Sequence, residues 1–444
     1  MKLYNSLHNK LEEFVPIEEG KVHMYVCGPT VYNYPHIGNA RPIVVFDTLK
    51  KTLEAIGYEV YYVSNFTDVD DKIIKKALEE GVEESTISER YIEAYNEDRR
   101  ALHASIPDAT PRVTQNMDAI IAFIKSLEDQ GYAYAIDGDV YFRVAKVKEY
   151  GQLSKQKIED LMVGARIDEN NKKENSLDFT LWKQTQNGIK WDSPWGKGRP
   201  GWHTECVVMI ENEFKQPVID IHGGGMDLKF PHHENEIAQS CAIHHTHVAN
   251  YWVHNGMLNL DGEKMSKSLG NVIWAKDFID KLGANVVRWL MLSTHYRAPL
   301  NVNEETIASA KIELGKLQTS LKQADVKLGI ANVEVKKELV REVYTPFILA
   351  MQDDLNTPNA FKAIFDANKQ LNMILRQKEV DFELLATLVY TIHQMLFILG
   401  IEIPSIQLNE EDRMLFHKWE QAKLQKDFKQ ADEIRQSLQK QGLL

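Results

Sequence analysis

Two short stretches of the sequence carry side chains suited to binding a polyphosphate. The first contains His36, Gly38 and Asn39, and the second contains Lys264 and Lys267 among serine and glycine residues. Lysines three positions apart can place two ammonium groups on one polyphosphate, which suits a transition state that gains negative charge there. A single His-x-Gly string is common by chance, so the indication rests on the two stretches occurring together.

The residues before His36 predict the elements that position the first stretch. Residues 22–27 form an apolar run rich in β-branched and aromatic side chains, Gly28 ends it, and apolar residues at helical spacing follow. In an open α/β sheet, ligands bind beyond the carboxyl ends of the strands, and the free N–H groups of a helix N-terminus favour phosphate. We therefore expect a phosphate site at residues 36–39, with Gly38 allowing close approach to the backbone.

In this order and at this separation, the two stretches resemble the HIGH and KMSKS signatures of the class I aminoacyl-tRNA synthetases. Asn39 stands where the first signature has its second histidine. Because an amide still donates a hydrogen bond, we expect rearranged contacts at this position rather than lost function. The resemblance implies that phosphates are stabilised in catalysis by His36, Asn39, Lys264 and Lys267. It implies an ATP site made of Thr30, His36, Gly38, Asn39, Lys264, Ser266 and Lys267.

Three cysteines, an odd number without a CxxC pair, disfavour both a disulfide framework and a sequence-local zinc finger. Cys241 lies in an apolar helical run, and we expect it to be a small buried hydrophobe. Cys27 ends the first predicted strand close to His36, and Cys206 follows soon after Trp202. We expect both thiols to converge on the same crevice.

A histidine and a carboxylate also occur at a spacing that suits a metal. A helix that begins near His232 places His232 and Glu236 four positions apart on one face. Alone, this pattern is more typical of capping and surface charge. Together with Cys27 and Cys206 it favours a metal site.

Here the resemblance narrows to the cysteinyl-tRNA synthetase family and covers roughly residues 3–438. It implies one zinc ion per chain, ATP with magnesium as a substrate, and L-cysteine and cysteine tRNA as partners of a monomer. A zinc centre prefers a thiolate to a hydroxyl, so a substrate thiol can be distinguished from serine through its bond to the metal. The implied zinc ligands are Cys27, Cys206, His232 and Glu236, and the implied amino-acid pocket contains Trp202, His222 and Asp227.

The expected fold is an α/β, Rossmann-like catalytic domain with a parallel sheet, interrupted by a connective insertion and followed by an α-helical bundle. Thr357 and Pro358 predict the N-cap and first residue of a C-terminal helix. Residues 412–441 predict a charged helical pair, which we expect to belong to a shortened anticodon-binding part. The expected segments are 1–83 (first catalytic half), 84–197 (insertion), 198–300 (second catalytic half), 301–407 (tRNA-binding bundle) and 408–444 (C-terminal helical segment).

Local patterns predict further elements in the first half of the chain. Residues 59–65 are typical of a second parallel strand, after which Asp70 or Asp71 is expected to cap a helix. Thr114 is expected to cap the first helix of the insertion. Residues 133–144 predict a hairpin turned at an Asp-Gly pair.

Composition limits the possible classes of protein. The chain has 444 residues, of which 43% are hydrophobic and 26% charged, as in ordinary globular proteins. Its formal charge of −12 argues against a general nucleic-acid binder, although a basic stripe on one face remains compatible with it. Residues 1–10 lack an apolar stretch of signal-peptide length, and His393 and Gln394 interrupt the longest apolar run. We expect a cytoplasmic protein without a membrane segment.

Three other functions share some of these features. A ligase that joins cysteine to an amino sugar would share the sheet, zinc site and both signatures, but would lack most of the helical half. A small-molecule nucleotidyltransferase would need neither the zinc ligands nor the tRNA-sized remainder. A non-enzymatic RNA-binding relative is expected to have lost His36 or Lys267, and both are present.

Overall fold

The computed structural model describes residues 1–156, 173–264 and 272–444. The chain forms two compact units. The first contains Met1–Lys281 and Tyr296–Asn301, and the second contains Leu282–His295 and Val302–Leu444. Most of the second lysine stretch, including Ser266 and Lys267, lies outside the described residues.

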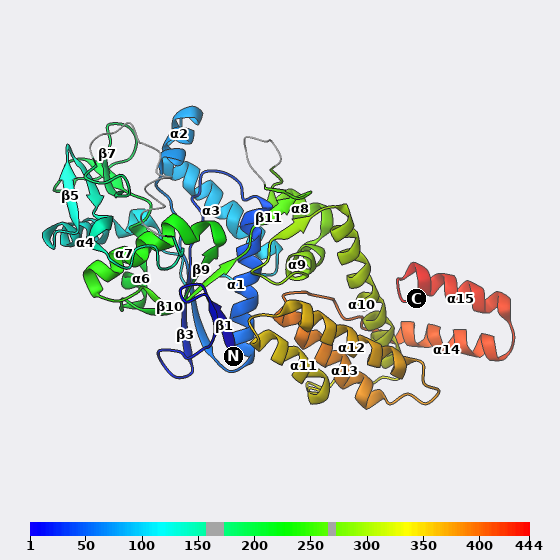
Figure 1. The fold of residues 1–444 in the computed structure, drawn as a ribbon. Coiled ribbons are helices and arrows are strands. Elements are labelled where there is room, and N and C mark those ends of the chain that lie inside the picture. The colour runs from blue at the N-terminus through cyan, green and yellow to red at the C-terminus, as the bar shows by residue number, and fades with distance from the viewer. Residues whose placement is uncertain (157–172, 265–271) are drawn as a thin grey trace. The chain divides into compact units, whose positions relative to one another are not determined.

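A four-stranded parallel sheet forms the centre of the first unit (Figure 1). The strands are, in spatial order, β10 (Ala249–Asn255), β9 (Ile219–Gly225), β3 (Lys21–Val26) and β4 (Glu59–Ser64). The predicted strands at 22–27 and 59–65 are confirmed as β3 and β4, which pair in parallel. The chain moves outward from β3 to β4 on one side and from β9 to β10 on the other. The carboxyl ends of β3 and β9 therefore form the topological switch point, where open α/β sheets bind their ligands.

Helices cover both faces of this sheet. The predicted helix after His36 is α1 (Ile37–Ala55), which connects β3 to β4. Its Phe46 ring lies against Gly223 of β9 so closely that a Cβ atom at residue 223 would be 2.2 Å from the ring. The other face packs in one apolar cluster with three helices. These are α4 (Met117–Asp129), α6 (Glu205–Phe214) and α7 (Glu234–His244).

The long connection between β4 and β9 begins with α2 (Asp71–Glu80) and α3 (Glu84–Ala101). Asp70 is the N-cap of α2, and its side chain accepts a hydrogen bond from the Lys72 amide. This confirms Asp70, one of the two residues predicted as the cap. The expected cap at Thr114 is wrong. Thr114 belongs to a 3-10 turn (Val113–Asn116) before α4, and its amide and hydroxyl both donate to Asp68, because a tertiary carboxylate there outcompetes local capping.

A four-stranded antiparallel sheet follows in the same connection. The predicted hairpin is confirmed, and Asp137 and Gly138 have φ values of 52° and 87° at its turn. Asp178 holds the hairpin in place, since it accepts hydrogen bonds from the Tyr134 hydroxyl and the Val144 amide at 2.8 and 3.0 Å. The strands are β5 (Ala133–Ile136), β6 (Asp139–Phe142), β7 (Phe179–Gln184) and β8 (Gly198–Pro200), in this spatial order.

Several short elements complete the first part of the chain. A hairpin at the start of the chain lies beside β10. The short strands between α7 and α10 form a small sheet in the order β12, β11, β13. The bounds are β1 (Lys2–Asn5), β2 (Lys10–Glu13), β11 (Leu258–Leu260), β12 (Glu263–Lys264), β13 (Leu300–Val302) and α8 (Ala275–Leu282).

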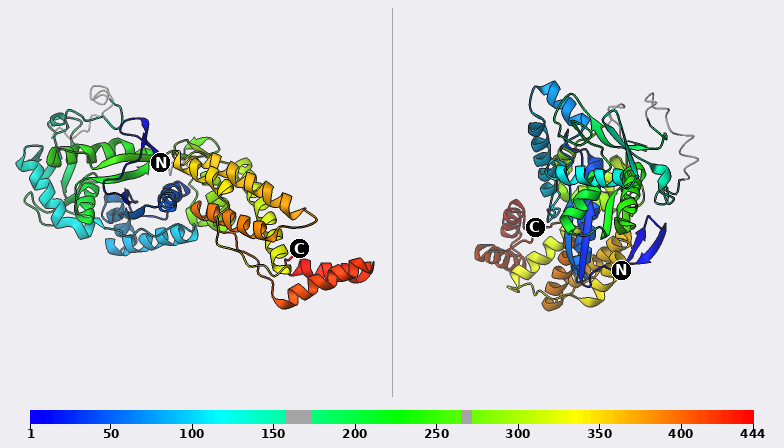
Figure 2. Two further views of the ribbon diagram at one scale, coloured as in Figure 1. Left: turned by 90° about the horizontal axis from the view of Figure 1, so that it is seen from below. Right: turned by 90° about the vertical axis from the view of Figure 1, so that its left-hand side faces the viewer.

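The second unit is helical, which confirms the predicted C-terminal half. The α12 helix is capped by Asn356, whose side chain accepts from the Asn359 amide, so the predicted N-cap at Thr357 is wrong by one residue. The predicted helical pair is confirmed as α14 and α15, which lie side by side in both figures (Figure 2). The helices are α9 (Ala284–Leu292), α10 (Glu304–Ile330), α11 (Arg341–Gln352), α12 (Thr357–Leu375), α13 (Phe382–Ile398), α14 (Glu410–Leu424) and α15 (Phe428–Lys440). Among the described residues, a search for helices of sufficient length and apolarity to cross a bilayer finds none.

Candidate active site and metal centre

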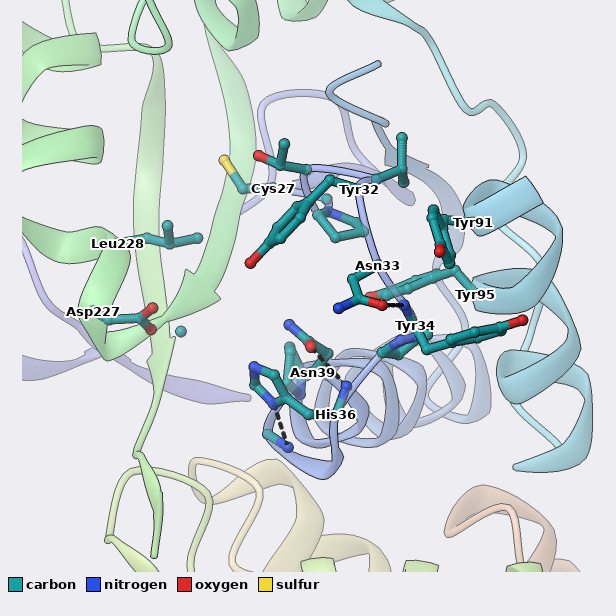
Figure 3. Close-up of a pocket in the computed structure, with 18 of the residues that line it drawn as sticks. Cys27, Tyr32, Asn33, Tyr34, His36, Asn39, Tyr91, Tyr95, Asp227 and Leu228 are labelled. Carbon is teal, nitrogen blue, oxygen red and sulfur yellow. Dashed lines mark hydrogen bonds between the residues drawn. The ribbon is translucent and has the colours of Figure 1, made fainter. Parts of the chain in front are cut away.

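A cavity of 330 Å³ lies at the switch point, beyond the carboxyl ends of β3 and β9 (Figure 3). The loop after β3 crosses the end of β4 so tightly that a Cβ atom at Gly28 would be 1.6 Å from the Asn65 carbonyl oxygen, so only glycine fits there. This loop carries Cys27 on one side of the cavity and leads to His36 on another. The predicted site residues among its lining are Cys27, Thr30, His36, Gly38, Asn39, Trp202 and Asp227.

The first signature forms the N-terminus of α1, where His36 is the N-cap. The Nδ1 atom of His36 accepts from the Gly38 amide at 3.1 Å, and Oδ1 of Asn39 accepts from the His36 amide at 3.1 Å. These bonds form a capping box, a reciprocal arrangement that satisfies two backbone donors. Asn39, which stands where the signature has its second histidine, therefore has a structural role. Its side-chain oxygen caps the helix, and its Nδ2 donor stays in the cavity wall.

The segment that follows the second signature contacts the first signature. Residues on either side of His36 pair with the segment that follows the signature: the Ile37 amide donates to the Ile273 carbonyl at 3.0 Å, and the Ala275 amide donates to the Pro35 carbonyl at 2.8 Å. Lys264 ends β12 and leads into that stretch. Ser266 and Lys267 are outside the described residues, so the contact that can be described is between the backbone beside His36 and residues 273 and 275.

The four residues predicted as zinc ligands come together on the β3 side of the cavity. Cys27 Sγ lies 3.6 Å from Cys206 Sγ and 3.7 Å from Glu236 Oε1. His232 Nε2 lies 3.6 Å from Cys206 Sγ and 2.9 Å from Glu236 Oε1. Tetrahedral zinc with bonds of about 2.0–2.3 Å separates its ligand atoms by roughly 3.3–3.7 Å. The three distances that involve a sulfur fall in this range, and the His232–Glu236 pair would have to separate by a few tenths of an ångström, so this group of thiols, imidazole and carboxylate fits zinc. Cys27 alone of the four is half-exposed, and it lines the cavity.

The helix that carries Glu236 begins slightly later than predicted. Residues Lys229–His233 form a π-helical turn, and the regular helix α7 starts at Glu234. His232 and Glu236 nevertheless face each other, as the spacing of four predicted. Cys241, on α7, packs against the apolar cluster beneath the sheet and belongs to no metal-binding group among the described residues.

The ionisable side chains of the metal group strongly shift one another's pKa values. Burial raises the pKa of Glu236, but the charges and hydrogen bonds of His222 and His232 outweigh it and hold the pKa well below its usual range. Burial lowers the pKa of His232, yet Glu236 and Cys206 raise it to about 10. Burial likewise opposes the Cys206 thiolate, but hydrogen bonds from Cys27 and His232 lower its pKa to about 6. Burial and the adjacent Cys206 raise the pKa of Cys27 well above its usual range, so metal binding must release protons from Cys27 and His232.

A second group of potential ligands shares Cys27 and Glu236 and adds His222 and His233. His222 Nε2 lies 2.6 Å from Glu236 Oε2, and the His222 ring stacks on Trp252 at 4.6 Å. His233 Nε2 lies 3.3 Å from Cys27 Sγ, and its Nδ1 is 2.8 Å from His254. The group with Cys206 and His232 contains two thiols, whereas the group with His222 and His233 contains only one. Because zinc favours thiolate ligands, the first group suits zinc better.

Sequence reasoning missed the histidines that surround the ligands. His203 Nδ1 lies 3.2 Å from His232 Nδ1, so it contacts the ring nitrogen of His232 that does not face the metal group. Trp202 stacks on His232 with ring centroids 4.4 Å apart and is 41% exposed. His233 and His254 also pack around the centre. The double histidine at 232–233 and the Trp-His pair at 202–203 are the signals that could have pointed to them.

Comparisons with known proteins agree with this arrangement. A family described as "tRNA synthetases class I (C) catalytic domain" matches residues 13–312, and one described as "DALR domain" matches residues 346–403. Mycobacterium tuberculosis methionyl-tRNA synthetase in complex with methionyl-adenylate matches with a TM-score of 0.60 at 15% identity, over 85% of this chain and 89% of that one. Thermus thermophilus arginyl-tRNA synthetase matches with a TM-score of 0.59 at 12% identity, over 90% and 85%. The fold is that of a class I aminoacyl-tRNA synthetase.

Sequence relatives narrow the class. A protein of Halalkalibacterium halodurans named Cysteine--tRNA ligase is 48% identical over all of this chain and 97% of its own length. A Geobacillus protein of the same name is 49% identical, again over all of this chain and 97% of that protein. The chain belongs to the cysteine--tRNA ligase family, which confirms the resemblance drawn from its two signatures and its cysteine and histidine residues.

Proposed function

We propose that the chain activates L-cysteine with ATP and transfers the cysteinyl group to the 3' end of cysteine tRNA. The observation that carries this proposal is the single cavity at the switch point. It has a thiol and carboxylate metal group on one side, at Cys27, and a helix N-terminus with a histidine and an amide on the other, at His36 and Asn39. An amino acid that carries a thiol and a nucleotide that carries phosphates can be held face to face there.

In the first step, the carboxylate of cysteine attacks the α-phosphorus of ATP, the bond to the β-phosphate breaks, and pyrophosphate leaves. The N–H groups and positive dipole end of α1 hold phosphate, with Nδ2 of Asn39 as a side-chain donor. Lys264 and Lys267 neutralise the charge that develops on pyrophosphate. Positioning and electrostatics suffice, and no side-chain nucleophile is required.

In the second step, a ribose hydroxyl at the 3' end of the tRNA attacks the carbonyl carbon of the adenylate, and AMP leaves. Thr30, Gly38, Trp202 and Asp227 all line the cavity. We assign Thr30 and Gly38 to the phosphates, and Trp202 and Asp227 to the amino acid. His222 is buried behind the metal group, and we assign it the role of orienting Glu236 through their 2.6 Å contact.

We assign the zinc to Cys27, Cys206, His232 and Glu236. Zinc bound by these residues would supply a soft Lewis acid that selects the substrate thiol over a hydroxyl. The half-exposed Cys27 faces the cavity, which is where a substrate thiol must arrive.

Cysteine-dependent exchange of pyrophosphate into ATP, measured with serine as the competing amino acid, tests the first step, and charging of cysteine tRNA tests the second. The proposal requires both activities and requires rejection of serine by roughly 10⁴ or more, since serine cannot form the thiolate contact. Exchange without tRNA charging would favour a ligase for a small cysteine acceptor. Pyrophosphate exchange that does not depend on cysteine would favour a nucleotidyltransferase.

A further inference from the structure

An aromatic and cationic surface adjoins the cavity, next to the residues assigned to ATP and cysteine. It consists of Tyr32, Tyr34 and Lys72, which all line the cavity and which have no part in the mechanism described above. Tyr32 and Tyr34 precede the N-cap of α1, and Lys72 lies in the first turn of α2. We refer to these three residues as the Tyr32–Lys72 surface.

Tyr34 presents an exposed ring on a rigid support. Its side chain is 48% exposed, whereas its neighbour Tyr91 on α3 is only 4% exposed. The Tyr34 ring packs edge-on against Tyr91 at 5.1 Å and against Trp274 at 6.4 Å, and two aromatic contacts of this kind fix its orientation. Figure 3 shows that the ring points away from His36 and Asn39 toward α3, so it extends beyond the end of the cavity that holds phosphate.

Lys72 adds a positive charge beside the second ring. Its Nζ lies 5.1 Å from the centroid of the Tyr32 ring, and in Figure 3 the Tyr32 side chain points into the cavity. Over the described residues Lys72 has no carboxylate partner, in contrast to Lys76 and Arg90, which both pair with Glu80 at 3.7 and 2.7 Å. A lysine at a substrate cavity without an acidic partner is available to an anion.

A supported ring at Tyr34 and a cation at Lys72, which line the same cavity, are suited to unpaired nucleotides. Bases of single-stranded RNA stack on aromatic side chains while lysine or arginine contacts the phosphates. Of the two nucleotide substrates, ATP has its phosphates at α1, whereas the tRNA must bring an unpaired 3' end into the cavity from outside. Tyr34 points away from the phosphate end of the cavity, whereas Tyr32 points into it, so the two rings could receive a strand that enters from outside.

We propose that the Tyr32–Lys72 surface binds the unpaired 3'-terminal nucleotides of the tRNA, with a base stacked on Tyr34 and a phosphate paired with Lys72. This inference rests on the proposed aminoacylation function and deepens it, because it assigns the entry path of the second substrate. It requires that the surface contribute to tRNA binding and aminoacyl transfer and not to ATP binding.

The test compares Tyr34→Ala and Lys72→Ala with the matched variants Tyr34→Phe and Lys72→Arg, which keep the ring and the charge. Each full-length variant is titrated with intact cysteine tRNA and with the same tRNA shortened at its unpaired 3' end. We expect each alanine variant to bind intact tRNA roughly fivefold or more weakly than the wild type, as for loss of one stacked base or one phosphate contact. Binding of the shortened tRNA should be unchanged, and the Phe and Arg variants should retain most of the affinity.

Pyrophosphate exchange without tRNA completes the test. The KM for ATP in exchange should be the same in Tyr34→Ala as in the wild type, whereas single-turnover transfer from preformed adenylate should slow. A raised KM for ATP would overturn the inference and place Tyr34 in the ATP site. Equal weakening of both tRNAs would also overturn it, since the lost contact would not involve the 3' end. If the wild type itself exchanges no pyrophosphate with cysteine, the proposed function fails, and this outcome does not depend on either side chain.

Discussion

Among single residues, the cysteines give the sharpest prediction about the metal. Cys206 is buried and its thiol lies among three other potential ligand atoms, whereas Cys241 is half-buried and belongs to no such group among the described residues. A serine hydroxyl is a poor zinc ligand, so Cys206→Ser should weaken zinc binding by roughly a hundredfold or more and abolish cysteine activation. Cys241→Ser is the matched control and should keep about one zinc per chain, measured by elemental analysis of purified protein.

The same measurement separates the two possible ligand groups. His233→Gln should keep its zinc if Cys206 and His232 are ligands, since His233 belongs only to the other group. Loss of zinc from His233→Gln together with retention in Cys206→Ser would assign the ion to the His222 and His233 group instead.

Asn39 allows capping and catalysis to be separated. Its Oδ1 caps α1, and its Nδ2 is the donor assigned to phosphate. Asn39→Asp keeps the acceptor and removes the donor, so it should keep the melting temperature while slowing pyrophosphate exchange roughly a hundredfold. Asn39→Ala should lose both activity and about 1 kcal/mol of stability. Calorimetry and exchange kinetics on the two variants separate the capping role from the catalytic one. An Asn39→Asp enzyme with wild-type activity would show that the side-chain Nδ2 group of Asn39 contacts no phosphate in the transition state.

Candidate site residues could be named from the sequence, but their pairings could not. The resemblance to known synthetases predicts four metal ligands, and the structure brings these four side chains together. Which nitrogen of His36 is engaged in the helix cap depends on local backbone geometry that a residue name does not specify. The histidines around His232 come from separate strands and turns, so only the packed sheet brings them to the centre.

Among the elements, α1 depends on a buried arginine for its position. Arg41 is fully buried, and its guanidinium donates to the carbonyls of Gly256, Met257 and Ala298, each at 2.7 Å. Burial lowers its pKa to about 10, and the three carbonyls substitute for a carboxylate partner. Gly256 and Met257 line the same cavity as Asn39, so Arg41 joins the helix of the first signature to a second segment of the cavity wall.

Replacement of Arg41 should therefore damage both the fold and the site. Arg41→Met removes three hydrogen bonds from a charged donor. The Gly256 carbonyl still accepts from Asn255 Nδ2 and the Met257 carbonyl from the Leu300 amide, so the main cost is the loss of the three guanidinium bonds. We expect a loss of about 3 kcal/mol in the free energy of unfolding. Arg41→Lys can donate to some of the three carbonyls. We expect it to restore most of the stability lost in Arg41→Met while the KM for ATP in pyrophosphate exchange stays raised. Calorimetry and exchange kinetics measured on the same preparations test this difference, and equal recovery of the two would limit Arg41 to a purely structural role.

A second element-level prediction concerns Asp325 on α10. Its Oδ2 accepts from the Ile406 amide at 2.8 Å, and burial raises its pKa from 3.8 to about 6. A carboxyl whose pKa is raised on folding contributes stability that is fully present below pH 3.8 and is lost as the pH rises to about 6. Asp325→Asn keeps an acceptor oxygen without the charge, so it should stabilise the protein by about 1–3 kcal/mol at pH 7.5 and very little near pH 4. Calorimetry at both pH values tests this, and an equal effect at both would mean that the charge is not the cause.

Elements were predictable where the pattern was strong and local, and less so at their ends. The parallel strands, α1 and the hairpin after α4 follow from apolar periodicity and turn residues. The two wrong caps have different causes. At Thr114 a carboxylate distant in sequence takes the hydroxyl, and at Thr357 a neighbouring residue, Asn356, is the better N-cap.

At the scale of the whole molecule, a protein with a net charge of −12 must bind tRNA, which is a polyanion. Its affinity for tRNA therefore has to come from local contacts. The hairpin of α14 and α15 offers exposed lysines interspersed with acidic residues, among them Lys423, Lys426 and Lys429. Lys423 lies 3.8 Å from the centroid of the Trp419 ring, so it too combines a cation with an aromatic side chain. These lysines either contact phosphates or belong to a solvated helix face.

Salt dependence distinguishes these two possibilities. Each phosphate contact adds roughly 0.7–0.9 to the slope of log affinity against log salt concentration, because a bound cation releases counterions from the RNA. We expect the dissociation constant for cysteine tRNA to rise steeply between low and physiological salt, while pyrophosphate exchange without tRNA changes much less. If the hairpin contacts phosphates, Lys423→Gln combined with Lys426→Gln should lower the slope by roughly 1.4–1.8. If the double variant leaves the slope unchanged, the hairpin lysines are solvated. If Lys72→Ala lowers the slope by just under 1 in the same assay, phosphate contacts lie near the cavity.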